Sequence, residues 1–163
     1  MRVAIITLSD SGYAGQREDK SGPVIRELAE AAGYEIVHTD LLPDGVEPLS
    51  SELKRLCDED LADLVLTTGG TGFSPTDLTP EATLAVTERP APGIAEAMRY
   101  KSLQITPRAM LSRAAAGIRK KTLIVNLPGS PKAVRECLEF ILPSLGHGLE
   151  ILRGTAGNCA SPE

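Results

Sequence analysis

The chain has 163 residues, which suits one domain of ordinary size with a hydrophobic core of its own. Hydrophobic residues make up 42% of the chain and aromatic residues only 3%, so the core must be aliphatic, as in proteins of alternating strands and helices. The net charge of −5 argues against a nucleic-acid-binding protein, and no stretch approaches the ~20 apolar residues that span a bilayer.

The first 68 residues alternate between strand patterns and helix patterns. Short apolar or alternating runs predict strands at residues 3–8, 34–42 and 63–68. Between them, helical spacing predicts a helix that begins at Ser21 or Gly22 and stops at Gly33. A second helix is marked by leucines at positions 49, 53 and 56.

The middle of the chain mixes clear and ambiguous patterns. Thr79 is expected to be the N-cap of a helix whose first turn contains Pro80 and Glu81. Further along, residues 92–103 read as a helix, residues 107–118 fit either a helix or a strand, and residues 121–127 are a strand.

The C-terminal part is expected to be helical in two pieces. Proline removes a hydrogen bond from a helix interior, so one helix is expected to end at Pro143 and a last one to reach about Leu152. Residues 1–153 would then form the single domain, and residues 154–163 a polar tail that is expected to be mobile. The N-terminal apolar run is too short for a signal peptide, and three spaced cysteines without a CxxC pair indicate reduced thiols, so the protein is expected in the cytoplasm.

The order of the elements predicts an α/β fold in three layers. Strands separated by helices imply right-handed crossovers and a mainly parallel sheet with helices on both faces. In such sheets ligands bind outside the carboxyl ends of the strands. Four strands end in loops rich in glycine, acids and hydroxyls: Ser9-Asp10-Ser11-Gly12, Pro43-Asp44-Gly45, Gly69-Gly70-Thr71-Gly72 and Asn126-Leu127-Pro128-Gly129-Ser130.

These loops together favour a metal-bound nucleotide. Glycines let the backbone approach a ligand closely, and free N–H groups with nearby hydroxyls make a phosphate cradle. Asp10, Asp44 and Asp77 would repel a bare phosphate but become useful when Mg²⁺ lies between them and the phosphate oxygens. Each feature alone has a plainer interpretation, because glycine turns are common, Asp44 suits a turn and Asp77 a helix cap.

Other polar residues have structural interpretations. His38 lies in a predicted strand and is expected to be structural, and His147 likewise. The lysines at positions 20, 120 and 121 are expected to be solvated. The glycine loop is not a P-loop, because no Gly-Lys-Ser/Thr follows it, and it lacks the third glycine of a dinucleotide-binding fingerprint.

Four segments resemble the signature segments of the MogA/MoaB family of molybdenum-cofactor biosynthesis proteins. They are TLSDSGYAGQREDKSGP, LLPDG, DLVLTTGGTGFSPTDLTPEAT and NLPGSPKAV, and the resemblance covers nearly the whole chain. It implies a compact α/β domain that is commonly a homotrimer. For the MogA type it implies transfer of AMP from Mg·ATP to the terminal phosphate of molybdopterin, with release of pyrophosphate. It also implies a MoeA-type partner that inserts molybdate and releases AMP.

The resemblance also implies roles for single residues. Asp77 and Asp44 match the acids that are expected to bind Mg²⁺ and to take part in catalysis. The other matched residues are expected to bind the substrates, and they are Ser9, Asp10, Ser11, Gly69, Gly70, Thr71, Gly72, Asn126, Pro128, Gly129 and Ser130. Which loop holds adenine and which holds the pterin stays open.

Two alternatives keep the same fold. A MoaB-type relative would have weak or no adenylyltransferase activity, or would serve a tungsten pathway. A non-catalytic carrier would bind molybdopterin and deliver it to a partner. The acids at positions 44 and 77 argue against the carrier, which has no need of a metal-binding acid near a phosphate.

Overall fold

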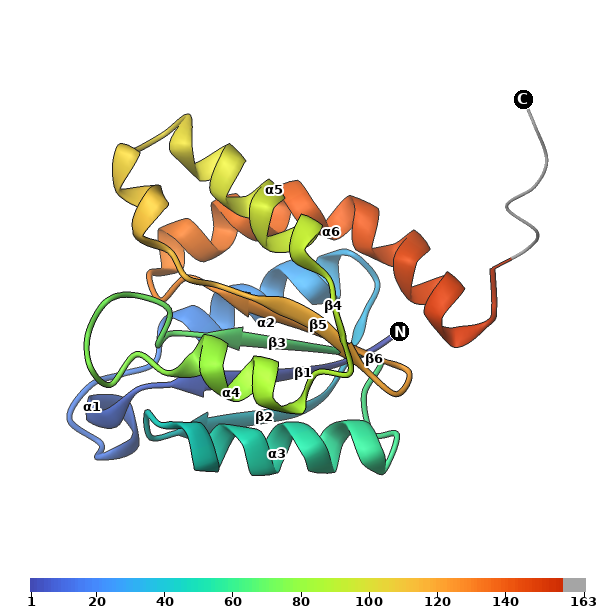
Figure 1. Ribbon diagram of the computed structural model, residues 1–163, viewed down its shortest axis with the longest axis horizontal. Coiled ribbons are helices and arrows are strands. Elements are labelled where there is room, and N and C mark those ends of the chain that lie inside the picture. Colours follow the sequence, from blue (N-terminus) through green and yellow to red (C-terminus); the bar gives the residue numbers. More distant parts are fainter. Residues whose placement is uncertain (157–163) are drawn as a thin grey trace.

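The computed structural model describes residues 1–156 and places helices on both faces of one six-stranded sheet (Figure 1). Across the sheet the strands follow the order β2 (Glu35–Leu42), β1 (Arg2–Leu8), β3 (Leu64–Thr68), β6 (Thr122–Leu127), β5 (Ala116–Arg119) and β4 (Arg89–Pro90). The first four are parallel, whereas β5 and β4 are antiparallel to their neighbours. The predicted α/β class with a mainly parallel sheet is confirmed.

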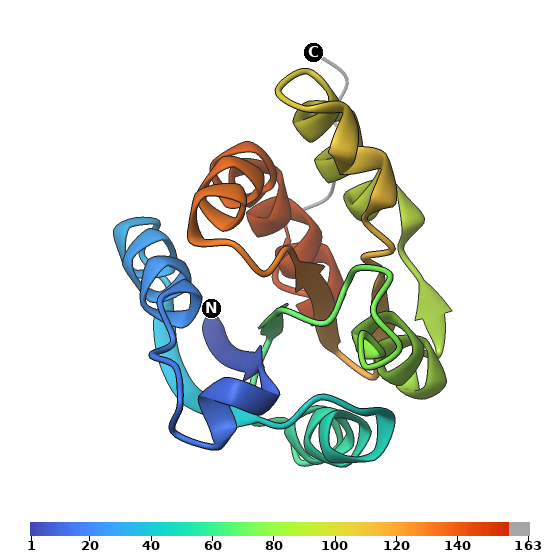
Figure 2. The same ribbon diagram turned by 90° about the vertical axis from the view of Figure 1, so that its left-hand side faces the viewer.

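Helices form the outer two layers (Figure 2). They are α1 (Asp10–Tyr13), α2 (Ser21–Ala31), α3 (Val46–Asp58), α4 (Thr79–Val86), α5 (Pro92–Leu103), η1 (Pro107–Leu111, a 3₁₀ helix) and α6 (Pro131–Arg153). Side chains from α2, α5 and α6 share one apolar cluster with the sheet, and those from α3 and α4 share another. Among residues 1–156, none of the helices combines the length and the hydropathy that a bilayer span requires.

The core is aliphatic, as the composition predicts. Successive side chains of a strand point to opposite faces, so Val3 and Ile5 of β1 join the cluster under α2 and α6. Ala4 and Ile6 join the cluster under α3 and α4. All four side chains are at most 2% exposed, which explains why β1 reads as a continuous apolar run.

The carboxyl ends of the four parallel strands lie at one edge of the sheet. In the strand register Leu8 pairs with Leu42, Thr7 with Thr68, and Thr68 with Leu127. The four loops singled out in the sequence therefore start side by side, and Figure 2 looks onto this edge. The prediction that these loops share one edge is confirmed.

The predicted break at Pro143 is wrong, because α6 continues through it to Arg153. The hydrogen bond that Pro143 cannot donate would go to the carbonyl of Glu139, and both residues lie on the exposed side of the helix. Leu142, Leu145 and Leu149 are buried on the inner side of the same helix. Their burial offsets the cost of the proline.

The structure also resolves one ambiguous stretch and adds one short strand that the sequence did not indicate. The ambiguous stretch 107–118 contains both candidate structures, because η1 covers its start and β5 its end. The short strand β4 was not predicted.

Of the expected polar tail, Gly154 takes a left-handed conformation (φ 75°) that ends α6, and residues 157–163 lie outside the described residues.

Asp60 is predicted to make the fold sensitive to acid. Hydrogen bonds from Arg153 (2.6 and 3.2 Å) and Arg2 (3.1 Å) lower the pKa of Asp60 to about 2. The ionised carboxylate therefore stabilises the fold above about pH 4, the unfolded pKa, and this contribution is lost as the pH falls towards 2. Because Asp60 is more than half exposed, the contribution should stay below about 1 kcal/mol.

Urea unfolding of the wild type and of Asp60→Asn between pH 7 and pH 2 measures this effect. The difference in unfolding free energy between the two proteins should shrink as the pH falls below about 4. Parallel pH curves for the two proteins would contradict the role given to Asp60.

Candidate functional site

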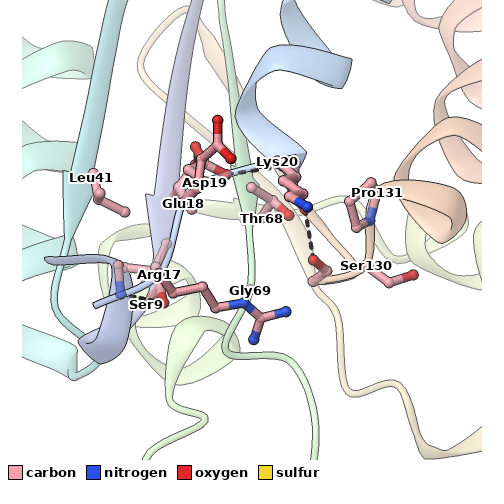
Figure 3. A pocket seen from close by; sticks show the side chains of 15 residues that line it. Ser9, Arg17, Glu18, Asp19, Lys20, Leu41, Thr68, Gly69, Ser130 and Pro131 are labelled. Atoms are coloured by element: carbon pink, nitrogen blue, oxygen red, sulfur yellow. Dashed lines mark hydrogen bonds between the residues drawn. The ribbon is translucent and has the colours of Figure 1, made fainter. Parts of the chain in front are cut away.

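A cavity of about 600 Å³ opens at the carboxyl edge of the sheet (Figure 3). It lies between the start of α2, at Ser21, and the start of α6, at Ser130 and Pro131. A second cavity of about 410 Å³ shares Thr7 and Asp19 with the first. Both volumes are in the range of small-molecule sites.

Four of the predicted substrate-binding residues line the larger cavity: Ser9, Gly69, Gly129 and Ser130. Hydrogen bonds fix the loop that carries the last two, because Thr68 Oγ1 donates to the carbonyl of Pro128 (2.7 Å) and Ser21 Oγ donates to that of Gly129 (2.7 Å). Ser130 Oγ accepts a hydrogen bond from the backbone N–H of Ala133 (3.1 Å) and so caps α6.

The cavity also contains charged residues that the sequence-based prediction did not assign to the site. Arg17 and Lys20 line it and are labelled in Figure 3. The prediction that Lys20 is solvated agrees with its exposure, but the residue also belongs to the cavity wall. Glu18 and Asp19 line the same cavity and balance these two positive charges, so the argument for an anionic ligand rests on the two helix N-termini with Arg17 and Lys20 beside them.

Two acids, Glu18 and Asp19, also line the cavity, and Asp19 holds the start of α2. Its Oδ1 accepts hydrogen bonds from the N–H groups of Ser21 and Gly22, both at 3.0 Å. Its Oδ2 accepts one from Thr7 Oγ1 at 2.7 Å. An acid two residues before a Ser-Gly-Pro helix start is a recognisable capping signal, which could have identified Asp19.

Three acids gather beside the cavity, on the side of the edge that faces α3 and α4. The N–H of Asp10 donates to Asp44 Oδ2 (3.1 Å), and the N–H of Asp44 donates to Asp10 Oδ1 (2.9 Å). Burial raises the pKa of Asp44, and the negative charges of Asp10 and Asp77 raise it further, although the hydrogen bond from the Asp10 backbone opposes both. This concentration of negative charge would be relieved by a bound cation.

The glycine loop lies between the cavity and the acids, and its backbone leaves no room for side chains. Gly69 (φ 93°) and Gly70 (φ 66°) have left-handed conformations that glycine adopts most easily. A Cβ on Gly69 would lie 2.3 Å from the carbonyl oxygen of Leu8, and one on Gly70 would lie 2.3 Å from Thr79 Oγ1. The loop therefore brings its backbone against β1 and α4 at the same time.

Thr79 is not the N-cap that the sequence predicts. It is the first residue of α4, and Leu78 holds the cap position without a side-chain hydrogen bond. The N–H of Thr79 instead donates to the carbonyl of Gly70 (3.1 Å), so this residue ties the glycine loop to the helix.

Asp77 is part of a compact turn that follows the glycine loop. Its Oδ2 accepts a hydrogen bond from the N–H of Ser74 (2.9 Å), while its own N–H donates to the carbonyl of Ser74 (2.9 Å). A Cβ on Gly72 would lie 2.9 Å from Asp77 Oδ2. The carboxylate is thus folded back towards the loop and is half-buried.

Two further predicted residues lie outside the cavity wall, one near this turn and one in the first loop. Thr71 is 7% exposed, and its carbonyl accepts a hydrogen bond from the N–H of Arg113 (2.9 Å). Ser11 Oγ lies 3.3 Å from Ser9 Oγ, at the start of the short helix α1. The structure therefore places some of the predicted residues in the cavity wall and others beside the adjacent acids, while the Asn126 side chain lies away from both.

The acids at positions 44 and 77 do not by themselves form a complete cation site. Within residues 1–156, the group of three ligand side chains whose donor atoms all lie within 4.8 Å of one another is His38, Asp40 and Glu52, not the acids at positions 10, 44 and 77. Glu52 is already held by Arg55 (2.6 and 2.9 Å), and its carboxylate lies 3.0 Å from His38 Nε2. Mg²⁺ prefers one or two carboxylates completed by phosphate oxygens and water, and Asp44 and Asp77 suit that arrangement.

Asn126 departs from its predicted role as a substrate-binding residue. Its side chain is fully buried and faces α4 rather than the cavity. Its amide nitrogen donates to Thr67 Oγ1 (3.0 Å) and Thr83 Oγ1 (2.8 Å), and its Oδ1 accepts from the N–H of Ala115 (3.1 Å). These bonds join β3, α4 and the start of β5, so the structure gives Asn126 a structural role.

Asn126→Ala is expected to lower the unfolding free energy by about 2–4 kcal/mol, because it leaves several buried polar groups without partners. The affinity of the folded protein for ligands of the cavity should not change. Urea unfolding and a binding titration check the two statements, with the exposed Ser51→Ala as the control. Unchanged stability with weakened ligand binding would instead support the prediction that Asn126 binds the substrate.

Comparisons with known proteins agree on one family. Residues 4–147 match the family described as "Probable molybdopterin binding domain". The chain is 40% identical over 156 residues to the molybdopterin adenylyltransferase of Helicobacter pylori strain J99, an alignment that covers 94% of this chain and 89% of that protein.

Solved structures give the same picture. The molybdopterin biosynthesis enzyme MoaB of Thermus thermophilus is 46% identical, with a TM-score of 0.89 over 94% of this chain and 96% of that chain. The tungsten cofactor synthesizing protein MoaB of Pyrococcus furiosus is 35% identical, with a TM-score of 0.81 over 93% of this chain and 96% of that chain.

Proposed function

The chain belongs to the molybdopterin-binding family of molybdenum cofactor biosynthesis, and from this premise we propose that it transfers AMP from ATP to molybdopterin. An oxygen of the terminal phosphate of molybdopterin forms a bond to the α-phosphorus of ATP, and the bond from that phosphorus to the bridging β-phosphate oxygen breaks. Adenylylated molybdopterin and pyrophosphate are the products. The observation that carries the proposal is a cavity at one sheet edge, with Arg17, Lys20 and two helix N-termini in its wall and a cluster of acids beside it.

The residues of the chain bind and orient two polyanions. Arg17 and Lys20 provide positive charge in the cavity for phosphate oxygens, and the backbone at Gly69 lets a ligand approach closely. Asp44 and Asp77 would hold Mg²⁺, which when bound supplies charge neutralisation at the phosphates. The main contribution to catalysis is then the alignment of the two reactants.

The reaction needs no protein nucleophile, because the attacking phosphate is already anionic at neutral pH. The described cysteines agree with this view. Burial raises the pKa of the Cys57 thiol to about 11, and burial also raises the pKa of Cys137. Both thiols are therefore protonated at neutral pH and unsuited to attack.

Two alternatives from the same fold are distinguishable by experiment. A MoaB-type protein of a tungsten pathway is suggested by the Pyrococcus furiosus structure, and a non-catalytic carrier would only bind molybdopterin. Pyrophosphate release from ATP should occur only when molybdopterin is present if the chain is the transferase. A carrier should release none under either condition.

The assembly and its setting are also part of the proposal. Exposed apolar side chains follow one another on α5, η1 and the segment between them: Tyr100, Leu103, Ile105, Met110 and Leu111. Such a concentration supports self-association, for which we propose a homotrimer. Sedimentation velocity should find trimers at micromolar concentration. A protein that sediments as a monomer would contradict this part of the proposal.

Adenylylated molybdopterin must be the substrate of a further protein, so we also propose a MoeA-type partner that inserts molybdate and releases AMP. Residues 1–153 are assigned to the adenylyl transfer. The cytoplasm is the proposed location, since it supplies ATP and keeps thiols such as Cys57 reduced.

A further inference from the structure

Arg113, between η1 and β5, is bonded to both ends of the turn that carries Asp77. Its backbone N–H donates to the carbonyl of Thr71 (2.9 Å), and its Nε donates to the carbonyl of Gly72 (2.8 Å). Its Nη2 donates to the carbonyl of Asp77, and the guanidinium also pairs with Glu81 in the first turn of α4.

These bonds determine the shape of the turn from residue 72 to residue 77. One planar guanidinium holds the carbonyls at its two ends at a fixed separation, and Glu81 holds the guanidinium itself. Inside the turn, the Asp77 carboxylate is oriented by the N–H of Ser74. The direction of that carboxylate therefore depends on a turn whose closure depends on Arg113.

Lysine could not replace this arrangement. An ammonium carries the same charge, but it lacks the fork of several N–H groups in one plane that reaches two carbonyls and a carboxylate together. Arg113 is also absent from the wall of the 600 Å³ cavity, so its effect on a ligand there must pass through the turn.

We propose that Arg113 is a positioning residue for adenylyl transfer, because it holds the turn 72–77 and thereby aims Asp77 at the metal-bound nucleotide. The inference rests on the proposed function of the chain. It adds a residue 36 positions away from Asp77 to the set that the reaction requires.

Arg113→Lys is the variant that tests this role. Its kcat should fall about 10- to 100-fold, as is usual when a residue that orients a ligand of a metal is replaced. The KM for molybdopterin should stay within about twofold, because the cavity is untouched. Arg119→Lys is the matched control, since Arg119 also binds a carboxylate (Asp58, 2.7 and 2.9 Å) and a carbonyl (Val86, 3.1 Å) but lies away from the site.

Two readouts separate positioning from simple stabilisation. The first is the affinity for Mn²⁺, as a Mg²⁺ substitute, in the presence of a non-hydrolysable ATP analogue, followed by electron paramagnetic resonance. Arg113→Lys should weaken it about tenfold and Arg119→Lys should not change it. The second is a double-mutant cycle, in which Arg113→Lys should have little further effect on kcat when Asp77 is already replaced by Asn.

The inference is overturned if folded Arg113→Lys keeps a kcat and a Mn²⁺ affinity within twofold of the wild type. It is also overturned if the loss of kcat is the same with and without Asp77. If instead the wild type forms no adenylylated product, the proposed function fails by itself, while the Mn²⁺ titration still decides whether Arg113 positions Asp77.

Discussion

Asp77→Ala is expected to lower the kcat of adenylyl transfer by about 100-fold or more, which is the usual cost of removing a group that stabilises charge in a transition state. The affinity for molybdopterin should change less than about threefold. Asp77 lies in the acid cluster beside the cavity and not in the cavity wall, so its loss leaves the wall of the cavity intact. Single-turnover kinetics and a binding titration measure the two quantities separately.

Asp58→Ala is the matched control for this prediction. Asp58 is also a carboxylate at the surface, but it pairs with Arg119 and lies at the far end of α3 from Asp44. Its removal should leave kcat within about twofold of the wild type. Asp77→Ala with unchanged turnover would remove Asp77 from the catalytic residues.

Gly69→Ala is expected to lower the unfolding free energy by about 2–4 kcal/mol. Alanine at φ 93° adopts a strained backbone, and its Cβ would lie 2.3 Å from the carbonyl oxygen of Leu8, which belongs to a buried strand and cannot move aside cheaply. Since Gly69 lines the cavity, the folded variant should also bind ligands more weakly. Urea unfolding gives the first quantity and a titration with ATP the second.

Gly33→Ala separates the two causes. Gly33 has a similar conformation (φ 83°), but a Cβ there would meet nothing within 4 Å. It should therefore cost only the conformational strain, about 1 kcal/mol, with no effect on ligand binding. Equal losses for the two variants would show that close packing against Leu8 does not determine the choice of glycine at position 69.

The loops at the edge of the sheet were predictable because local signals mark them. Each of the four parallel strands is a short apolar or alternating run that stops at glycine, proline or a polar residue, and parallel strands joined by helices must end on the same side. Asp10, Asp44 and Gly69 could thus be placed near one another without knowledge of the register. The expected reaction, transfer of AMP from ATP to molybdopterin, came from the resemblance to the MogA/MoaB family.

The remaining features depend on contacts between distant residues. Arg113 carries no local signal of its role, because the partners of its side chain are 32 to 41 positions away. Asn126 lies in β6, just before the loop, and faces α4, since side chains alternate along the strand and the sequence alone does not tell which face is which. Pro143 would end an isolated helix, whereas the burial of α6 along its inner side keeps it continuous.

The most direct test of the proposed activity is to incubate the purified protein with molybdopterin, ATP and Mg²⁺ and to analyse the products by mass spectrometry. The account predicts adenylylated molybdopterin and pyrophosphate in equal amounts, and neither product with Asp77→Ala on the same timescale. Molybdopterin that remains bound but unmodified by the wild-type protein would contradict the proposed transfer and favour a carrier.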